Sequence, residues 1–356
     1  MVSTELHIKV VSSKEEYESF LASTENSLFY HSWDYGDLLA RHLEAERIIL
    51  GAFDDDNLVA SFPFLMSKEG AYGRAINSMP YYGSNGGVLV CSDTDADREK
   101  EITELLLQRS REIATENQVG SMTIISNPLR PQSSQVLESV LDMEKTDQRI
   151  GQITPLPDSI EEDAVLLSVF DNPRPRNIRK AIKSGIVVEA SNNQEDMDFL
   201  FEVHKSNIES IGGLSKKKEF FDTVLSVISE NDWKIYVAKL DGKPVSALLL
   251  FYFGNTMEYF TPATVHDYRN IQPSSLLIFE GMKDGIEKGY KYFNWGGTWF
   301  TQEGVYNFKK KWGAQDFKYE YYTLILNQDI YKADRATLLG DYYGFYVISF
   351  DKLNDE

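Results

Sequence analysis

Two distant stretches of this chain repeat one pattern of residues. Ile49–Phe64 and Ile235–Leu250 each contain two apolar runs joined by a short polar turn, which predicts a β-hairpin. Each predicted hairpin is followed by a loop, a long helical pattern and another strand. Any two hairpins are somewhat alike, but the shared order of elements favours a duplicated α/β chain. At one common offset, four residue pairs match: Ile49 with Ile235, Ala52 with Ala238, Asp55 with Asp241, and Val59 with Val245.

The second repeat ends in the most informative motif of the sequence. Asn294-Trp-Gly-Gly-Thr298 closes an apolar strand, and Phe308-Lys309 follows shortly after it. Glycines at the end of a strand allow a ligand to approach the backbone closely. A lysine just beyond supplies positive charge where an anion binds or develops. This arrangement is typical of a transferase site rather than of a metal or nucleophile site.

Composition limits the classes of function. The chain has 356 residues, enough for two domains, and its net charge of −19 argues against sequence-independent binding to DNA or RNA over the whole surface. The single Cys91 excludes a disulfide framework, and the five histidines show no metal-ligand spacing. No secretory signal is recognised, and the longest apolar run, Ala247–Phe253, is too short to span a bilayer. We therefore expect a soluble, cytoplasmic protein without a metal. This expectation is compatible with peripheral contact with a membrane.

Three stretches of the second half carry a resemblance to a known family. They are the basic helical pattern from Arg176 to Val188, the hairpin Ile235–Leu250 with Tyr259 and Tyr268–Leu277, and the closing run from Tyr290 to Lys309. In this order they resemble the FemABX peptidyl and aminoacyl transferases and the related FemAB-like acetyltransferases. The resemblance implies an α/β protein of two halves with the GNAT (acyl-CoA N-acyltransferase) fold, whose mixed sheets share a groove. We place the N-terminal half at residues 1–160 and the C-terminal half, with the family signature, at residues 161–356.

The resemblance also implies a reaction. A FemABX-like enzyme would transfer an acyl or aminoacyl group onto an amine of a cell-envelope, peptide or glycan precursor, by direct attack of the amine. The sequence shows no Ser-His-Asp or Cys-His arrangement for a covalent enzyme intermediate, which agrees with direct attack. Two alternatives stay open. One is an acyl-CoA-dependent N-acetyltransferase of an amino sugar or polysaccharide precursor, and the other is a non-catalytic binding module of the same fold.

Lys309 is the candidate catalytic residue. In the family that this chain resembles, the lysine of a Phe-Lys pair stabilises the negative oxygen that develops as an amine attacks an acyl ester, and Phe308-Lys309 matches that pair. A charge held in a partly dry pocket acts most strongly on charge that appears in the transition state. Without the resemblance, the run from Phe308 to Lys311 is also compatible with a solvated turn.

A helix rich in arginine and lysine is the candidate anion site. The spacing of Arg176, Lys180 and Lys183 places them on one helical face, and Arg179 lies close to it. We expect Arg176 and Arg179 to hold a sugar diphosphate, a lipid pyrophosphate or a tRNA acceptor end. The alternative is that this face is paired with the nearby acidic run at residues 161–163.

Phe308 and four further aromatic residues complete the predicted substrate site. By resemblance, the segments around Trp33 and Tyr81 line the acceptor groove, where their rings would stack on sugar or peptide. Tyr259 and Tyr306 are candidates to line the acyl pocket. Without the resemblance, Trp33 and Tyr81 are equally compatible with the hydrophobic core.

The acyl donor stays open between aminoacyl-tRNA and acyl-CoA, each of which would be a co-substrate rather than a bound cofactor. Acyl-CoA acyltransferases cradle the pyrophosphate with backbone amides of a glycine-rich turn at a helix N-terminus. The corresponding segment here, Arg269–Ser275, has no glycine, and Pro273 lacks an amide hydrogen. A coenzyme A site at this turn is therefore disfavoured, although FemAB-like acetyltransferases share the departure. Asn294 stands where FemABX members commonly have an aspartate, which weakens the case for a carboxylate base there.

Overall fold

Both predicted hairpins are present in the computed structural model of the chain, which describes residues 6–80, 86–130, 137, 143–159, 161–349 and 352. The matched residues Asp55 and Asp241 both adopt the left-handed conformation at the turn, with φ of 53° and 49°. The repeat in the sequence is therefore also a repeat of backbone geometry. β2 (Glu46–Asp54) pairs antiparallel with β3 (Asn57–Met66), and β9 (Trp233–Leu240) pairs antiparallel with β10 (Lys243–Phe253).

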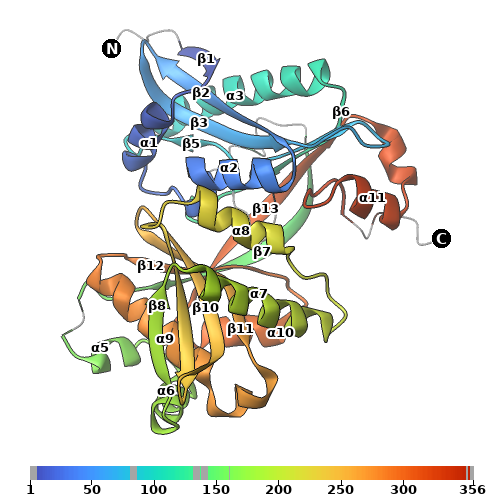
Figure 1. Ribbon diagram of the computed structural model, residues 1–356. Coiled ribbons are helices and arrows are strands. Elements are labelled where there is room, and N and C mark those ends of the chain that lie inside the picture. Colours follow the sequence, from blue (N-terminus) through green and yellow to red (C-terminus); the bar gives the residue numbers. More distant parts are fainter. Residues whose placement is uncertain are drawn as a thin grey trace. The chain divides into compact units, whose positions relative to one another are not determined.

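The chain forms two compact units, which differ from the two halves placed from the sequence. Unit 1 contains Met1–Arg149 and Phe317–Glu356, and unit 2 contains Ile150–Asp316 (Figure 1). The sequence prediction assigned everything after residue 160 to the second half, whereas the structure packs the C-terminal segment with unit 1.

Unit 1 contains a mixed sheet in the order β1-β2-β3-β4-β6-β13, with β5 beside β3. Two helices lie between β1 and β2 in the sequence, and α3 connects the parallel strands β4 and β6. The further elements of this unit are β1 (Leu6–Val10), α1 (Lys14–Ala22), η1 (Phe29–His31), α2 (Trp33–His42), β4 (Arg74–Asn77), β5 (Leu89–Val90), α3 (Ala96–Glu116), β6 (Val119–Ile125), β13 (Gln315–Ile325), η3 (Gln328–Lys332) and α11 (Arg335–Asp341).

Unit 2 repeats this plan in the order β8-β9-β10-β11-β12-β7. Two helices again lie between the first two strands, and α9 connects the parallel strands β11 and β12. The further elements are the second part of β7 (Glu144–Pro155), which enters this unit at Ile150, and α5 (Asp163–Leu167), α6 (Arg174–Lys183), β8 (Val187–Ser191), α7 (Gln194–Glu209), α8 (Lys218–Val227), β11 (Thr256–Thr264), η2 (His266–Ile271), α9 (Pro273–Glu287), β12 (Tyr292–Thr298) and α10 (Glu303–Lys310).

The sixth strand of each sheet comes from the other repeat. β7 follows β6 in the sequence but pairs antiparallel with β12 in unit 2. β13 follows β12 in the sequence but pairs antiparallel with β6 in unit 1. This exchange explains why the compact units do not follow a single cut of the chain.

Helices cover both faces of the unit 2 sheet (Figure 1). On one face, α6 and α9 bury Ile178, Leu277 and Phe279 in a core that also contains Trp295 and Trp312. On the other face, Phe221 of α8 lies 5.7 Å from Phe201 of α7, and Phe220 of α8 stacks on Phe260 of β11 at 5.6 Å, both measured between ring centroids. None of the helices in the described ranges is both long and apolar enough to cross a membrane.

The basic helix α6 begins and ends at residues that favour the limits of a helix. Pro175 occupies the first turn, where a missing amide hydrogen costs little, and Gly185 follows the helix in the left-handed conformation with φ of 84°. Ile178 and Ala181 are buried, whereas Arg176 and Lys180 are exposed. The helix therefore anchors through a narrow apolar stripe and presents its cations to solvent.

Candidate functional site

The paired glycines form an irregular end to β12. The register between β12 and β7 shifts between Asn294 and Gly297. Gly296 has φ of 69°, and a Cβ there would meet no atom within 4 Å, so the left-handed backbone rather than crowding favours glycine. The Oδ1 atom of Asn294 accepts a hydrogen bond from the Gly296 amide at 2.9 Å. Asn294 therefore acts here as a turn-forming side chain.

Lys309 of α10 reaches this strand end. Its Nζ donates to the carbonyl oxygen of Gly297 at 3.0 Å and to Oγ1 of Thr298 at 2.8 Å. The side chain is only 6% exposed, and burial lowers the pKa of Lys309 to about 8. It forms no ion pair with any carboxylate of the described residues. A solvated lysine on a turn, the alternative from the sequence, is therefore not what the structure contains.

A buried polar chain supports the Lys309 contacts. The Thr298 hydroxyl donates to Oε1 of Gln152 at 3.1 Å, and Nε2 of Gln152 donates to the carbonyl oxygen of Tyr306 at 3.2 Å. Gln152 and Thr298 are fully buried. Each group has a defined partner, so the chain holds β7, β12 and α10 in one arrangement. Sequence reasoning did not identify Gln152, because a lone glutamine in a strand has no local pattern.

Aromatic rings form the apolar side of the site. Trp295, in the middle of β12, lies 4.9 Å from Tyr259 and 6.0 Å from Phe308 between ring centroids. Trp312 lies 5.9 Å from Trp295 and is fully buried. Burial raises the pKa of the half-buried Tyr259 well above its ordinary value, which keeps this phenol neutral. Tyr259 and Phe308 thus both lie against Trp295, and their roles in substrate binding stay predictions.

Arg174 fastens α6 to this aromatic group. Its Nη2 donates to the carbonyl oxygen of Phe308 at 3.0 Å, and the guanidinium lies 4.3 Å from the centroid of the Phe308 ring. Burial lowers the pKa of Arg174, but an arginine remains charged at neutral pH. Although Arg174 belongs to the basic helix, the structure places it inside, against α10.

Tyr306 lies on the same helix but points to another partner. Its hydroxyl donates to Oδ2 of Asp316 at 2.8 Å, and this hydrogen bond raises the pKa of Tyr306. Its backbone carbonyl is the acceptor for Gln152. The hydroxyl of Tyr306 is therefore engaged at the surface of α10, and a role of the ring in an acyl pocket stays a prediction.

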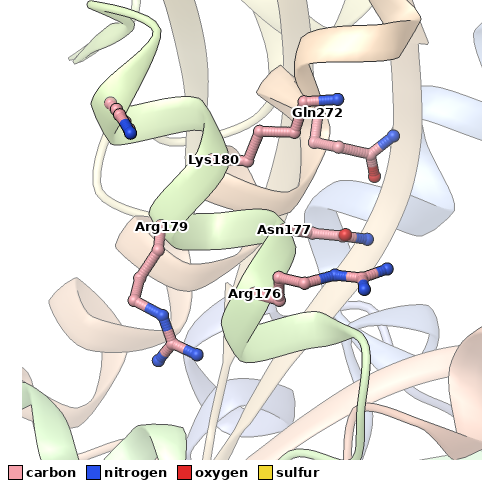
Figure 2. A pocket seen from close by; sticks show the side chains of 6 residues that line it. Arg176, Asn177, Arg179, Lys180 and Gln272 are labelled. Atoms are coloured by element: carbon pink, nitrogen blue, oxygen red, sulfur yellow. The ribbon is translucent and has the colours of Figure 1, made fainter.

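Arg176 and Arg179 line a pocket of about 520 Å³ beside the start of α9. Figure 2 shows Arg176, Asn177 and Lys180 extending from α6 on the side where Gln272 lies, whereas Arg179 extends from the opposite side. The pocket is lined by Arg176, Asn177, Arg179, Lys180, Lys183 and Gln272.

The two candidates from the N-terminal half belong to unit 1. Trp33 is partly buried at the start of α2, and the Arg47 guanidinium lies 3.9 Å from the centroid of its ring. Tyr81 lies outside the described residues. His31, in the same region as Trp33, is buried, and burial lowers its pKa to about 4, so it is neutral. The roles of Trp33 and Tyr81 in an acceptor groove stay predictions.

Lys216 was also missed by sequence reasoning. The run Lys216–Lys218 reads as a solvated helix start, and Lys218 does pair with Asp198 and Asp222. Lys216, however, is 7% exposed, and burial lowers its pKa to about 7.

No group of His, Cys, Asp and Glu side chains suited to a metal ion occurs within the described ranges.

Comparisons with known proteins show which families this chain is similar to. The family model described as an acetyltransferase (GNAT) domain matches residues 175–319. The lipid II:glycine glycyltransferase of Staphylococcus epidermidis is 22% identical over 344 residues, covering 72% of this chain and 80% of the relative. The enzyme of the same name from Staphylococcus aureus is 21% identical over 412 residues, covering 88% of this chain and 93% of the relative.

Solved structures confirm the fold. The crystal structure of FemX superposes with a TM-score of 0.74 at 18% identity, covering 92% of this chain and 99% of that chain. A tandem GNAT protein from the clavulanic acid biosynthesis pathway superposes with a TM-score of 0.58 at 10% identity, covering 90% and 98%. The predicted class of two GNAT-like halves is confirmed. In sequence the chain is therefore similar to the lipid II:glycine glycyltransferases, and it shares the GNAT fold.

Proposed function

We propose that this chain transfers an aminoacyl group from aminoacyl-tRNA onto an amine of a lipid-linked cell-envelope precursor. One observation carries the proposal: a buried lysine, without a carboxylate partner among the described residues, is fixed at the end of β12. The likeness to lipid II:glycine glycyltransferases over most of the chain supports a lipid-linked acceptor. The glycine-free turn before α9 supports a donor other than acyl-CoA.

The chemistry follows from the state of Lys309. The amine nitrogen of the acceptor attacks the acyl carbon, and the carbonyl oxygen becomes negative as the C–N bond forms. An ammonium has three N–H donors, and Gly297 and Thr298 accept two of them. The third is available for the oxyanion, in a site where burial strengthens the interaction. The C–O ester bond then breaks, the ribose oxygen leaves with a proton, and the amine nitrogen loses one.

The remaining candidate residues receive binding roles in this proposal. Phe308 and Tyr259 form an apolar wall beside Lys309, which suits an acyl group with a small side chain. Arg176 and Arg179 hold anionic parts of a substrate. Trp33 and Tyr81 contact the sugar or peptide of the acceptor, and Tyr306 lines the acyl pocket with its ring. Direct attack is supported by Cys91, whose pKa is raised by burial, so that a thiolate nucleophile is disfavoured.

An acyl-CoA-dependent N-acyltransferase is the second candidate. It is favoured by one observation, the match of residues 175–319 to a GNAT acetyltransferase domain. Both candidates use Lys309 in the same way and differ only in the donor.

One experiment separates the two candidates. The purified chain is incubated with lipid II and either glycyl-tRNA or acetyl-CoA, and the mass of the lipid product is measured by mass spectrometry. The proposal predicts addition of one or more aminoacyl residues with the tRNA donor and no product with acetyl-CoA. An acetylated product with acetyl-CoA alone would contradict the proposed donor, and the Lys309→Ala variant serves as the control for enzyme-dependent transfer.

A further inference from the structure

Two loops of unit 2 expose large apolar side chains. In the loop between α7 and α8, Ile211 is 78% exposed and Leu214 is 81% exposed, the two highest values for a large hydrophobic residue in the described ranges. In the turn between β12 and α10, Trp299 is 50% exposed and Phe300 is 55% exposed. Single exposed hydrophobic residues are common on soluble proteins, whereas groups of them mark interaction sites. We call these four residues the apolar rim.

Both loops lie at one edge of the sheet. β11 and β12 are parallel, so their carboxyl ends share an edge, and Trp299 directly follows β12. At the end of α7, Nδ2 of Asn207 donates to the carbonyl oxygen of Thr264, the last residue of β11, at 3.1 Å. Lys309 contacts the end of β12 at the same edge. The apolar rim therefore lies at the edge that carries the candidate catalytic residue.

Backbone hydrogen bonds fix both loops. The amide of Gln302 donates to the carbonyl oxygen of Trp299 at 3.0 Å, and the amide of Tyr306 donates to the carbonyl oxygen of Gln302 at 2.9 Å, which continues the turn into α10. In the other loop, the amide of Gly213 donates to the carbonyl oxygen of Ile208 at 3.0 Å and closes the end of α7. Each loop thus holds its apolar side chains in defined positions while they stay exposed.

Both loops lack acidic residues, in a chain that contains 55 of them. Residues 210–218 include three lysines and no acid, and residues 294–302 include no charged side chain. Aromatic residues are enriched where lipid meets water, and apolar surfaces that insert there have basic or uncharged surroundings. The acids nearest in sequence are Glu209, Glu219 and Glu303. Burying a carboxylate is costly, so insertion is limited to the loops themselves.

The chemistry of the rim favours a bilayer over a nucleic acid or a protein. Ile211 and Leu214 are aliphatic and cannot stack on bases, which is how aromatic side chains bind single strands. Four side chains that are 50–81% exposed offer less than the roughly 800 Å² per partner of a standard protein interface. A lipid-linked acceptor keeps its lipid in the bilayer while its amine reaches Lys309, so the edge that carries Lys309 must approach the bilayer.

We propose that the apolar rim inserts into the surface of a lipid bilayer and brings the edge that carries Lys309 to a lipid-linked acceptor. The inference rests on the proposed function for the acceptor, and it adds the surface by which the chain reaches that acceptor. Burial of apolar area drives this binding, so anionic lipid is not required. Because the net charge of the chain is −19, anionic lipid repels the rest of the surface. Phosphatidylcholine vesicles should therefore bind the chain at least as well as vesicles that also contain phosphatidylglycerol.

Tryptophan fluorescence reports the insertion directly. Trp299 is exposed, whereas the other four tryptophans of the chain are buried or partly buried. Phosphatidylcholine vesicles should shift the emission of the wild type to shorter wavelengths and protect it from quenching by iodide. Trp299→Phe should still bind vesicles but lose this shift. A wild type whose emission does not change at saturating vesicle concentration would overturn the proposal.

Vesicle flotation tests the contribution of each loop. The two rim variants are Trp299→Gln with Phe300→Gln and, separately, Ile211→Gln with Leu214→Gln. Each should lower the partition coefficient on phosphatidylcholine vesicles by about tenfold or more, since two inserting side chains are lost. Rising salt should not weaken binding of the wild type, because the interaction is apolar.

The matched control for flotation is Val165→Gln with Leu339→Gln. These residues are 42% and 43% exposed, on α5 and α11, outside both loops. The control should bind vesicles as the wild type does, which shows that the effect belongs to the rim rather than to any exposed apolar side chain. Equal partition of the wild type, the rim variants and the control would overturn the proposal.

Transfer assays separate this inference from the proposed function. With lipid II in vesicles, the rim variants should raise the KM for the acceptor, and with a soluble UDP-linked muropeptide they should react at the wild-type rate. Vesicle binding that depends on the rim in a protein without transfer activity would support the inference and reject the proposed function. Transfer to lipid II in vesicles with the same KM in the wild type and the rim variants would overturn the inference and leave the proposed function standing.

Other partners of the rim would give different results. Self-association in sedimentation experiments that the rim variants abolish, without vesicle binding by the wild type, would assign the rim to a second copy of this chain. Weaker binding of an RNA hairpin by the Trp299→Gln, Phe300→Gln variant, with vesicle binding unchanged, would assign the turn to nucleic acid. Either result would overturn the proposal.

Discussion

The ammonium of Lys309 and the carbonyl oxygen of Gly297 lie 3.0 Å apart, which ties α10 to the irregular end of β12. Thr298 accepts a second hydrogen bond from the same ammonium, and Gln152 in turn accepts from Thr298. The position of the charge is thus set by the backbone of one strand and by a side chain of another. Such a charge needs no reorganisation when an oxyanion develops beside it.

The contact with Thr298 should position Lys309. Thr298→Val removes the hydroxyl at nearly constant volume, so the ammonium loses one acceptor and Gln152 loses its donor. We expect kcat to fall about tenfold, in line with the loss of a hydrogen bond to a charged group. The basic limb of the pH profile should also move to lower pH, because the charged form of Lys309 is less stabilised. Thr298→Ser should restore both, and a Val variant with an unchanged pH profile would contradict the positioning role.

Activity should decline as Lys309 loses its proton. Burial lowers the pKa of Lys309 to about 8, and only the protonated form can stabilise an oxyanion. We therefore expect kcat/KM to fall above about pH 8. Lys309→Arg keeps its charge throughout this range, so a weakly active Arg variant should lack the decline. Steady-state measurements of kcat/KM between pH 6 and pH 10 test this prediction. If the wild type and the Lys309→Arg variant show the same decline at high pH, the decline belongs to another group.

The same pKa makes Lys309 a source of pH-dependent stability. The folded value of about 8 lies below the unfolded value of about 10.4, so between them the unfolded chain binds more protons. The contribution of Lys309 to the free energy of unfolding therefore rises with pH across this window. Lys216, with a pKa of about 7, acts in the same direction, so the comparison must be made with Lys309→Met. Denaturant unfolding should show that the free energy of unfolding of the wild type increases relative to that of this variant between pH 7 and pH 10. A difference in free energy that stays constant over this range would contradict the lowered pKa.

Trp312 should be the main support of the aromatic side of the site. It is fully buried against Phe170, Trp295 and Phe308. Trp312→Ala should lower the free energy of unfolding by about 3–5 kcal/mol through lost contacts and a cavity. Trp312→Phe should cost less, about 1.5 kcal/mol, because the indole N–H has no hydrogen-bond partner among the described residues. Equal losses in the two variants would show that ring packing is not the source of the stability.

Local patterns explain what could be predicted from the sequence. The hairpins and the helix α9 were predictable, because polar turns, helical spacing and a flanking proline and glycine are encoded nearby. The limits of α6 were predictable for the same reason. Asp163–Phe170 reads as a buried strand but contains the helix α5, since a short apolar run does not distinguish the two.

Long-range pairing explains what could not be predicted. The exchange of β7 and β13 between the repeats depends on strands that are distant in sequence, so no local signal reveals it. In the site, Phe308-Lys309 was recognised by resemblance, whereas the contact of Arg174 with Phe308 and the burial of Lys216 depend on tertiary packing. The local sequence around a charged residue is similar whether its side chain is exposed to solvent or buried in a core.

The most direct test of the central claim is a single-turnover assay with Lys309→Ala. Enzyme in excess over aminoacyl-tRNA is mixed with lipid II, and the rate of amide formation is compared with that of the wild type. Lys311→Ala is the matched control, since Lys311 is an exposed neighbour without an ion pair among the described residues. Loss of an oxyanion-stabilising group should slow the chemical step by about 10²–10³, with donor affinity retained and the control near wild type. A Lys309→Ala protein that transfers at the wild-type rate would contradict the account.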